Sequence, residues 1–200
     1  LQTWAEERMI LRTWRYAAPL VQTMPDAALK DINHAVTWWM EVASKSISIH
    51  EKILLDLCRR VLALEKGSEP HGIETNDLVG SAINHPIGHV TQTLVNLWFQ
   101  QNPNDNDRLP ADLEPIFTTL CDTQIDQFRY GRVLLGSRLI AFFRVDRPWT
   151  EQQLLPLFGW NDTVEAKAGW EGFLWSPRLS PPLLEAFKSQ FFESAKHYPA

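Results

Sequence analysis

The chain has 200 residues, of which 44% are apolar and 22% charged, and its formal net charge is −5. This composition excludes a disordered tail, and the length suffices for a self-contained core, since a chain of this size buries roughly 70% of its surface on folding. The acidic balance argues against a generic nucleic-acid-binding protein, which needs clustered Lys and Arg to displace counterions from phosphates.

Cys58 and Cys121 are the only cysteines, and each lies alone in a stretch with helical spacing. This pattern excludes a disulfide framework and is typical of the reducing cytoplasm, where we expect the protein to be found. No apolar run reaches the roughly 18 residues that a membrane-spanning helix requires, so no membrane association is predicted. Because the chain begins at Leu1 rather than at a methionine, we expect residues 1–200 to form a single helical domain excised from a larger protein.

Three helices are predicted in the first third of the chain from apolar residues spaced three and four apart. They are expected at residues 4–17, 25–43 and 48–66. Pro19 should end the first, because proline lacks the backbone donor that a helix interior needs. Ser48-Ile49-His50-Glu51 is a capping box that should open the third, and Gly67 suits the residue after its last turn.

The stretch from Leu78 to Asn104 contains no Lys, Arg, Asp or Glu. Its apolar residues fall on one face of a helix that begins after the Asn84-His85-Pro86 break, where proline disfavours a continuous helix. The opposite face carries polar but unionised side chains, namely His89, Gln92, Thr93, Asn96 and Gln100. A solvent-facing stripe usually carries charges, so this helix is expected to contact protein on both sides.

The rest of the chain also shows helical spacing between loops. An Asn- and Asp-rich loop at 102–109 precedes predicted helices at 110–122, 125–145, 150–159, 163–175 and 180–197. Gly131 or Gly136 is expected to interrupt the second of these, since glycine disfavours a helix interior. With about nine or ten helices and no convincing strand, the sequence predicts an all-α fold, an irregular array of helix pairs like those of HEAT and armadillo proteins.

Candidates for catalysis or metal binding lack the partners that such chemistry requires. His85 and His89 are four residues apart, which suits a metal on one helix face, but no carboxylate or thiol lies in the same stretch. The loop at 102–107 has oxygen donors without the glycine and glutamate of a calcium-binding loop. Asp122 and Asp126 form an acidic pair at helical spacing, which serves catalysis only inside a cleft. We therefore expect this fragment to bind no cofactor or metal and to lack enzymatic activity.

One basic cluster lies late in the chain and consists of Arg129, Arg132, Arg138, Arg144 and Arg147. Clustered arginines suit phosphate groups or an acidic protein partner. Residues 67–128, however, contain nine acidic side chains and one basic side chain. We therefore favour ion pairs between the arginines and this acidic segment.

Aromatic side chains crowd the same part of the chain: Trp149, Trp160, Trp170 and Trp175, with Phe158 and Phe173. Tryptophan is enriched both in the cores of helical domains and in binding surfaces, and the sequence leaves both roles open. The candidate partner-binding residues are the four tryptophans together with Arg129, Arg132, Arg144, Arg147 and His89.

Two segments, AINHPIGHVTQTLVNLW (82–98) and GWEGFLWSPRLSPPLLEAF (169–187), carry a resemblance to a known family. They resemble an uncharacterised helical domain found C-terminal to sirtuin-like modules in bacterial proteins proposed to act in anti-phage defence. The segments cover under a fifth of the chain and include no catalytic signature. The resemblance implies an NAD-cleaving module elsewhere in the parent protein and a sensing, scaffolding or oligomerising role here.

Two functions from different classes follow from these observations. The first is a non-catalytic sensor or scaffold domain that binds protein, either a phage protein or other domains of its parent, with oligomerisation through the parent as a further expectation. The alternative is a nucleic-acid contact domain that uses the Arg129–Arg147 segment.

Overall fold

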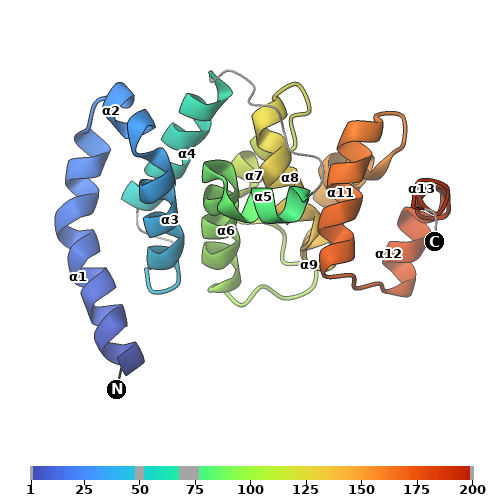
Figure 1. Ribbon diagram of the computed structural model, residues 1–200. Coiled ribbons are helices and arrows are strands. Elements are labelled where there is room, and N and C mark those ends of the chain that lie inside the picture. The colour runs from blue at the N-terminus through green and yellow to red at the C-terminus, as the bar shows by residue number, and fades with distance from the viewer. Residues whose placement is uncertain (1, 48–51, 68–76, 199–200) are drawn as a thin grey trace. The chain divides into compact units, whose positions relative to one another are not determined.

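The computed structural model describes residues 2–47, 52–67 and 77–198, with side chains from Met9 onward. Every regular element in these ranges is helical and none is a strand, which confirms the predicted all-α fold (Figure 1). The capping box predicted at 48–51 and most of the loop predicted after Gly67 lie outside the described residues. Across the same ranges, no helix combines the length and the apolar character that crossing a membrane requires.

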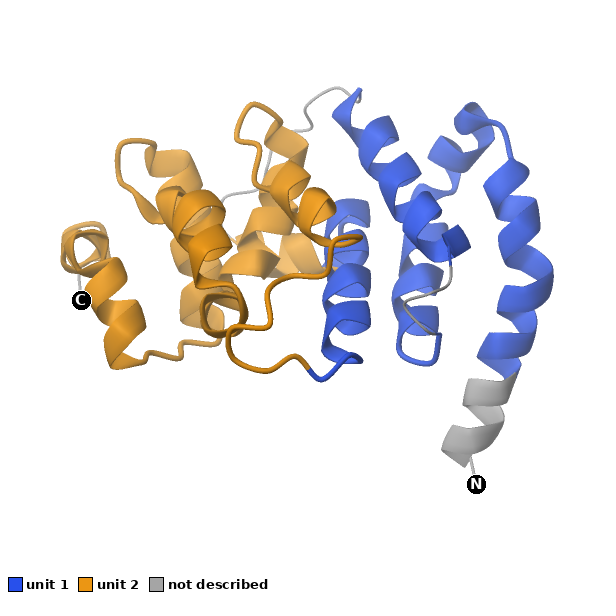
Figure 2. Cartoon of the chain, turned by 180° about the vertical axis from the view of Figure 1, so that it is seen from behind, with its two compact units in different colours: residues 1–69, 84–102 blue, residues 70–83, 103–200 orange. Residues whose placement is uncertain are grey.

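The chain divides into two compact units (Figure 2). Unit 1 consists of Leu1–Glu69 and Asn84–Asn102, and unit 2 of Pro70–Ile83 and Pro103–Ala200. The charge-free stretch Leu78–Asn104 is therefore shared between the two units. A regular HEAT- or armadillo-like repeat stays a prediction, since the described α-helices range from 3 to 22 residues in length.

Unit 1 is built from helices α1 (Gln2–Thr23), α2 (Asp26–Asp31), α3 (Asn33–Ser44), α4 (Lys52–Lys66) and α6 (Pro86–Phe99). Helix α6 packs mainly on α3 and also contacts α4, while α1 contacts both α3 and α4. Helix α6 is buried on almost every side, including the polar positions His89, Thr91 and Thr93. This agrees with the prediction that the charge-free helix contacts protein on both faces.

Two predicted helix boundaries in unit 1 are wrong. Helix α1 continues through Pro19 to Thr23, because its inner face, with Trp14 and Ala18 buried, is stabilised by tertiary packing that outweighs one lost backbone bond. The helix predicted at 25–43 is two helices, divided at Ile32, whose backbone angles are φ −117° and ψ 12°. No glycine or proline marks this second break, so no local signal predicts it.

Unit 2 begins with α5 (Leu78–Asn84), whose last residue belongs to unit 1. Its other elements are α7 (Glu114–Leu120), the 3-10 turn η1 (Asp126–Phe128), α8 (Arg129–Gly136), α9 (Leu139–Val145), α10 (Arg147–Trp149), the π-helical turn η2 (Thr150–Leu154), the 3-10 turn η3 (Leu155–Phe158), α11 (Thr163–Trp175), α12 (Pro181–Ala186) and α13 (Lys188–Ser194). The predicted interruption of the 125–145 helix falls after Gly136. The helix predicted at 180–197 is instead divided at Phe187.

Helices α8 and α11 are the most closely packed pair of unit 2, and glycines permit the approach. A Cβ atom built on Gly172 would lie 1.9 Å from the carbonyl oxygen of Val133, and one on Gly136 would lie 2.8 Å from that of Gly169. Both distances are too short for any side chain. The two backbones therefore touch where any larger residue would force them apart.

Candidate functional site

Apart from His89, the polar face of α6 meets α3 through hydrogen bonds between uncharged groups. The Nδ2 atom of Asn96 donates to Oγ of Ser44 at 2.9 Å, and Nε2 of Gln100 donates to the Ser44 carbonyl at 2.5 Å. Gln92 in turn donates to Oδ1 of Asn96 at 3.0 Å. Burying these hydrogen-bonded amide groups costs less desolvation free energy than burying charged side chains would. This difference explains why the stretch contains no charged residue.

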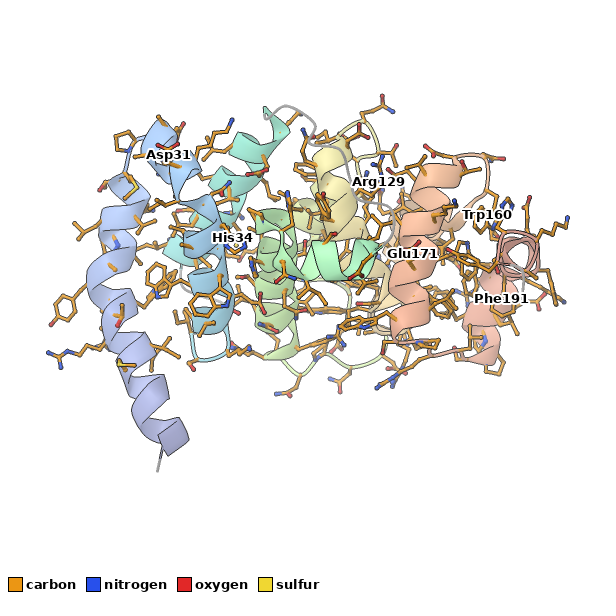
Figure 3. All side chains as sticks on the ribbon, viewed as in Figure 1. Asp31, His34, Arg129, Trp160, Glu171 and Phe191 are labelled. Carbon is orange, nitrogen blue, oxygen red and sulfur yellow. The ribbon has the colours of Figure 1, made fainter. Side chains whose placement is uncertain are left out.

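His89 is the one candidate site residue in unit 1, and it is buried against α3. Its Nδ1 atom lies 2.6 Å from Oε2 of Glu41, at hydrogen-bonding distance. Its Nε2 atom is buried and has no hydrogen-bond partner among the described residues. The ring of His34, labelled in Figure 3, approaches edge-on with its centroid 5.4 Å away.

The two histidines that are four residues apart have separate roles. His85 is the N-cap of α6 and accepts a hydrogen bond from the backbone N–H of Ile87 at 3.2 Å. His89 pairs with Glu41 instead, so the two imidazoles do not converge on one ion. Within the described residues, no three His, Cys, Asp or Glu side chains lie close enough to hold a metal.

Arg132 and Arg129, two of the predicted partner-binding arginines, bind Glu165 on α11. Arg132 is fully buried and forms a bidentate pair with this carboxylate at 2.6 and 2.8 Å. Arg129 reaches the same carboxylate at 2.7 Å and Asp126 at 2.8 Å. The Nη1 atom of Arg132 also donates to the backbone carbonyl of Asp122 at 2.8 Å. This network ties α8, α11 and the turn after α7 together.

Arg144 and Arg147 lie at the surface, with more than half of each side chain exposed. Arg144 pairs with Asp105 at 2.8 Å, and Arg147 pairs with Glu151 at 2.7 Å. The predicted pairing with the acidic segment 67–128 is therefore found for two of the four, Arg129 with Asp126 and Arg144 with Asp105. For Arg132 and Arg147 it is wrong, because their partners Glu165 and Glu151 lie outside that segment.

Three of the four candidate tryptophans are buried, so the structure places them in the core. Trp149 donates its Nε1 proton to Thr118 at 2.9 Å. Trp170 donates to the carbonyl of Phe158 at 3.1 Å and stacks on Phe187, with ring centroids 5.5 Å apart.

Trp160, labelled in Figure 3, lies against the C-terminal part of unit 2. Its ring is nearly parallel to that of His197 at a centroid distance of 3.7 Å, and its Nε1 atom lies 3.4 Å from the Gln190 carbonyl. The buried N–H groups of all three tryptophans thus have acceptors, as a core position requires.

Trp175 differs from the other three, since 55% of its surface is exposed at the C-terminal end of α11. Leu174 and Leu179 beside it are also exposed. Sequence reasoning missed a second exposed tryptophan, Trp38 on α3, which is 58% exposed, whereas its neighbour Trp39 stacks on Trp14. The helical spacing of the buried residues Val36, Met40 and Ala43 is a signal that Trp38 lies off the inner face.

Four described side chains have pKa values raised mainly by burial. Burial raises the pKa of both Cys58 and Cys121 to about 12, which keeps these thiols protonated and unreactive. Burial also raises the pKa of Tyr198 to about 12, with the charge of Glu171 as a second cause. The pKa of Glu171 itself is raised by burial, an effect that Lys167 and a hydrogen bond with the Leu78 backbone oppose.

No protein-family model, curated protein or solved structure matches the chain. The resemblance of residues 82–98 and 169–187 to the helical domain of sirtuin-containing proteins therefore stays a proposal.

Proposed function

We propose that the chain is a non-catalytic, protein-binding helical domain and that Trp175 lies at the centre of a contact surface of unit 2. The supporting observation is the contrast among the four tryptophans of this region. Three are buried with satisfied N–H groups, whereas Trp175 is exposed next to apolar neighbours. An exposed tryptophan with apolar neighbours is characteristic of the centre of a protein–protein contact.

The chain around Trp175 has the properties of a preorganised contact surface. Residues 174–182, LWSPRLSPP, include three prolines, and Arg178 is their only charge. Proline reduces the backbone freedom that binding would otherwise remove. The segment is held at both ends by helices, since α11 ends at Trp175 and Ser180 caps α12 by accepting from the backbone N–H of Leu183 at 3.4 Å.

The proposal extends to the parent protein through the resemblance of residues 82–98 and 169–187. On that basis the domain is a sensor or scaffold of a multidomain bacterial defence protein, with an NAD-cleaving module elsewhere in the parent. Its partner is a phage protein or another domain of the parent. The purified fragment is expected to hydrolyse neither NAD nor nucleic acid, and measurable turnover of either would contradict this role.

Nucleic-acid binding through Arg129–Arg147 has less support than protein binding, because four of the five arginines in this segment have carboxylate partners. An electrostatic phosphate contact weakens steeply as salt is added. Titration of labelled single- and double-stranded nucleic acid at low and moderate salt therefore tests it directly. Binding at low salt that is lost as salt rises, and lost again in Arg144→Glu, would favour this alternative over protein binding.

Site-specific crosslinking tests the Trp175 surface. A photoreactive amino acid at position 175 should crosslink a partner from lysate of phage-infected cells, whereas the same group at the exposed position Lys167 on α11 should not. Trp175→Ser should abolish co-purification of that partner without changing the thermal unfolding temperature. Equal crosslinking from positions 175 and 167, or co-purification that survives Trp175→Ser, would place the contact elsewhere.

A further inference from the structure

Helix α1 in unit 1 exposes an apolar stripe that nothing described in the structure covers. Met9, Tyr16 and Leu20 are 64%, 73% and 70% exposed. They lie within about 40° of one another around the helix and extend along about 16 Å of its length. The opposite face, with Trp14 and Ala18, is buried, so α1 is apolar on two faces and only one of them serves the fold of unit 1.

The charged residues of α1 between positions 8 and 24 are all arginines. Arg12 and Arg15 are exposed on one flank of it, at about 60° and 120° around the helix from Met9. Among the described side chains, neither has an ion-pair partner, in contrast to Arg129, Arg132, Arg144 and Arg147 of unit 2. Residues 8–24 contain three arginines and no Asp or Glu, so α1 supplies no acid of its own there.

The shape and charge of this face define the partner that fits it. A straight stripe one side chain wide, with positions 7 and 11 residues apart, matches the groove between rows of side chains on another helix. Cations on its flank call for carboxylates on the partner. A second copy of α1 does not supply them along the stripe, because residues 8–24 contain no Asp or Glu, and an antiparallel pair would bring the four arginines together.

We propose that the outer face of α1, formed by Met9, Arg12, Arg15, Tyr16 and Leu20, binds an acidic amphipathic helix of another protein. The apolar side chains of that helix pack on the stripe, and its Asp or Glu residues pair with Arg12 and Arg15. This surface belongs to unit 1 and is distinct from the one around Trp175, so the two proposals fail independently.

The test uses two designed helical peptides as probes, with identical leucines at heptad spacing and either Glu or Lys on the flanks. The whole 200-residue chain should bind the Glu peptide at least about 10-fold more tightly than the Lys peptide, as measured by fluorescence anisotropy. The double variant Arg12→Glu with Arg15→Glu should reverse this preference. Tyr16→Gln should weaken binding of the Glu peptide about 10-fold or more. The control Phe192→Gln, an exposed apolar side chain of unit 2, should leave it unchanged.

Four results would overturn the proposal. They are equal affinity for the two peptides, loss of binding in the Phe192 control, binding to phosphatidylserine-containing vesicles that depends on Tyr16, and self-association in sedimentation that Tyr16→Gln removes. The last two would assign the face to a membrane surface or to a second copy of the chain. Circular dichroism of each variant confirms that an observed loss is not unfolding, and because all the substituted side chains are exposed, the native spectrum should be retained.

Discussion

The α3–α6 contact of unit 1 and the α8–α11 contact of unit 2 bury polar groups in different ways. The first uses amides, a hydroxyl and one His89–Glu41 pair, while the second uses the Arg132–Glu165 ion pair beside glycines that let the backbones touch. Removing one partner of a neutral hydrogen bond costs little stability, whereas removing one partner of an ion pair in a close-packed interface costs much more. The two contacts should therefore respond very differently to substitution.

The largest effect is expected at Glu165. Among the described residues, Glu165 is the one carboxylate that Arg132 contacts, so Glu165→Ala leaves a buried guanidinium with backbone carbonyls as its partners, which should destabilise the protein by about 3–5 kcal/mol. Urea unfolding followed by circular dichroism measures this loss. The control Glu151→Ala removes an exposed pair with Arg147 and should cost less than about 1 kcal/mol. Equal losses of unfolding free energy in the two variants would show that the buried pair contributes no more to stability than the exposed pair.

The next largest loss of stability is expected where the backbones of α8 and α11 pack closely together. Gly172→Ala would place a methyl group 1.9 Å from the Val133 carbonyl, a position that only movement of the backbones relieves. The expected loss of stability is about 1–3 kcal/mol, in the range of overpacked cores. Gly67→Ala is the control, because its nearest neighbour, the Leu64 carbonyl, is 3.8 Å from the added atom. If both variants unfold at the same urea concentration, the helices are not in glycine-dependent contact.

A smaller effect is expected in the neutral interface of unit 1. Asn96→Ala removes the hydrogen bond to Ser44, whose hydroxyl keeps its bond to the Glu41 carbonyl at 2.7 Å. The cost should be about 0.5–1.5 kcal/mol, well below that of Glu165→Ala. The same urea titration measures it, with exposed Asn161→Ala as the control. A loss as large as that at Glu165 would remove the distinction between the two interfaces.

The smallest effect is the pH dependence that Glu171 contributes. Its pKa is raised above its ordinary value of 4.5, so the folded protein binds more protons than the unfolded chain between these two values. Stability should therefore fall as pH rises from 4.5 through the raised pKa, by less than about 1 kcal/mol because the side chain is only partly buried. Glu171→Gln should remove this slope and be slightly more stable at neutral pH. A slope of the opposite sign in the difference between the two proteins would contradict the raised pKa.

The all-α fold and most helix positions were predictable, because periodic apolar residues and local caps determine them. The predicted break at Asn84-His85-Pro86, where α6 begins, and the missing charges of the 78–104 stretch both correspond to features of the structure. The candidate binding residues were less predictable. Trp149, Trp160, Trp170 and Trp175 lie in one short part of the chain, yet only Trp175 is exposed, since burial depends on which distant helices cover each ring.

The sequence by itself determined the helical class and the charge-free character of α6, because these are properties of composition and spacing within one segment. Only the tertiary structure decided that α1 passes through Pro19 and that Arg132 faces Glu165, 33 residues later in the chain. It also revealed that Gly172 meets the backbone of Val133. Each of these depends on free energy gained between segments far apart in the chain, which outweighs local propensity and leaves no local pattern from which to predict it.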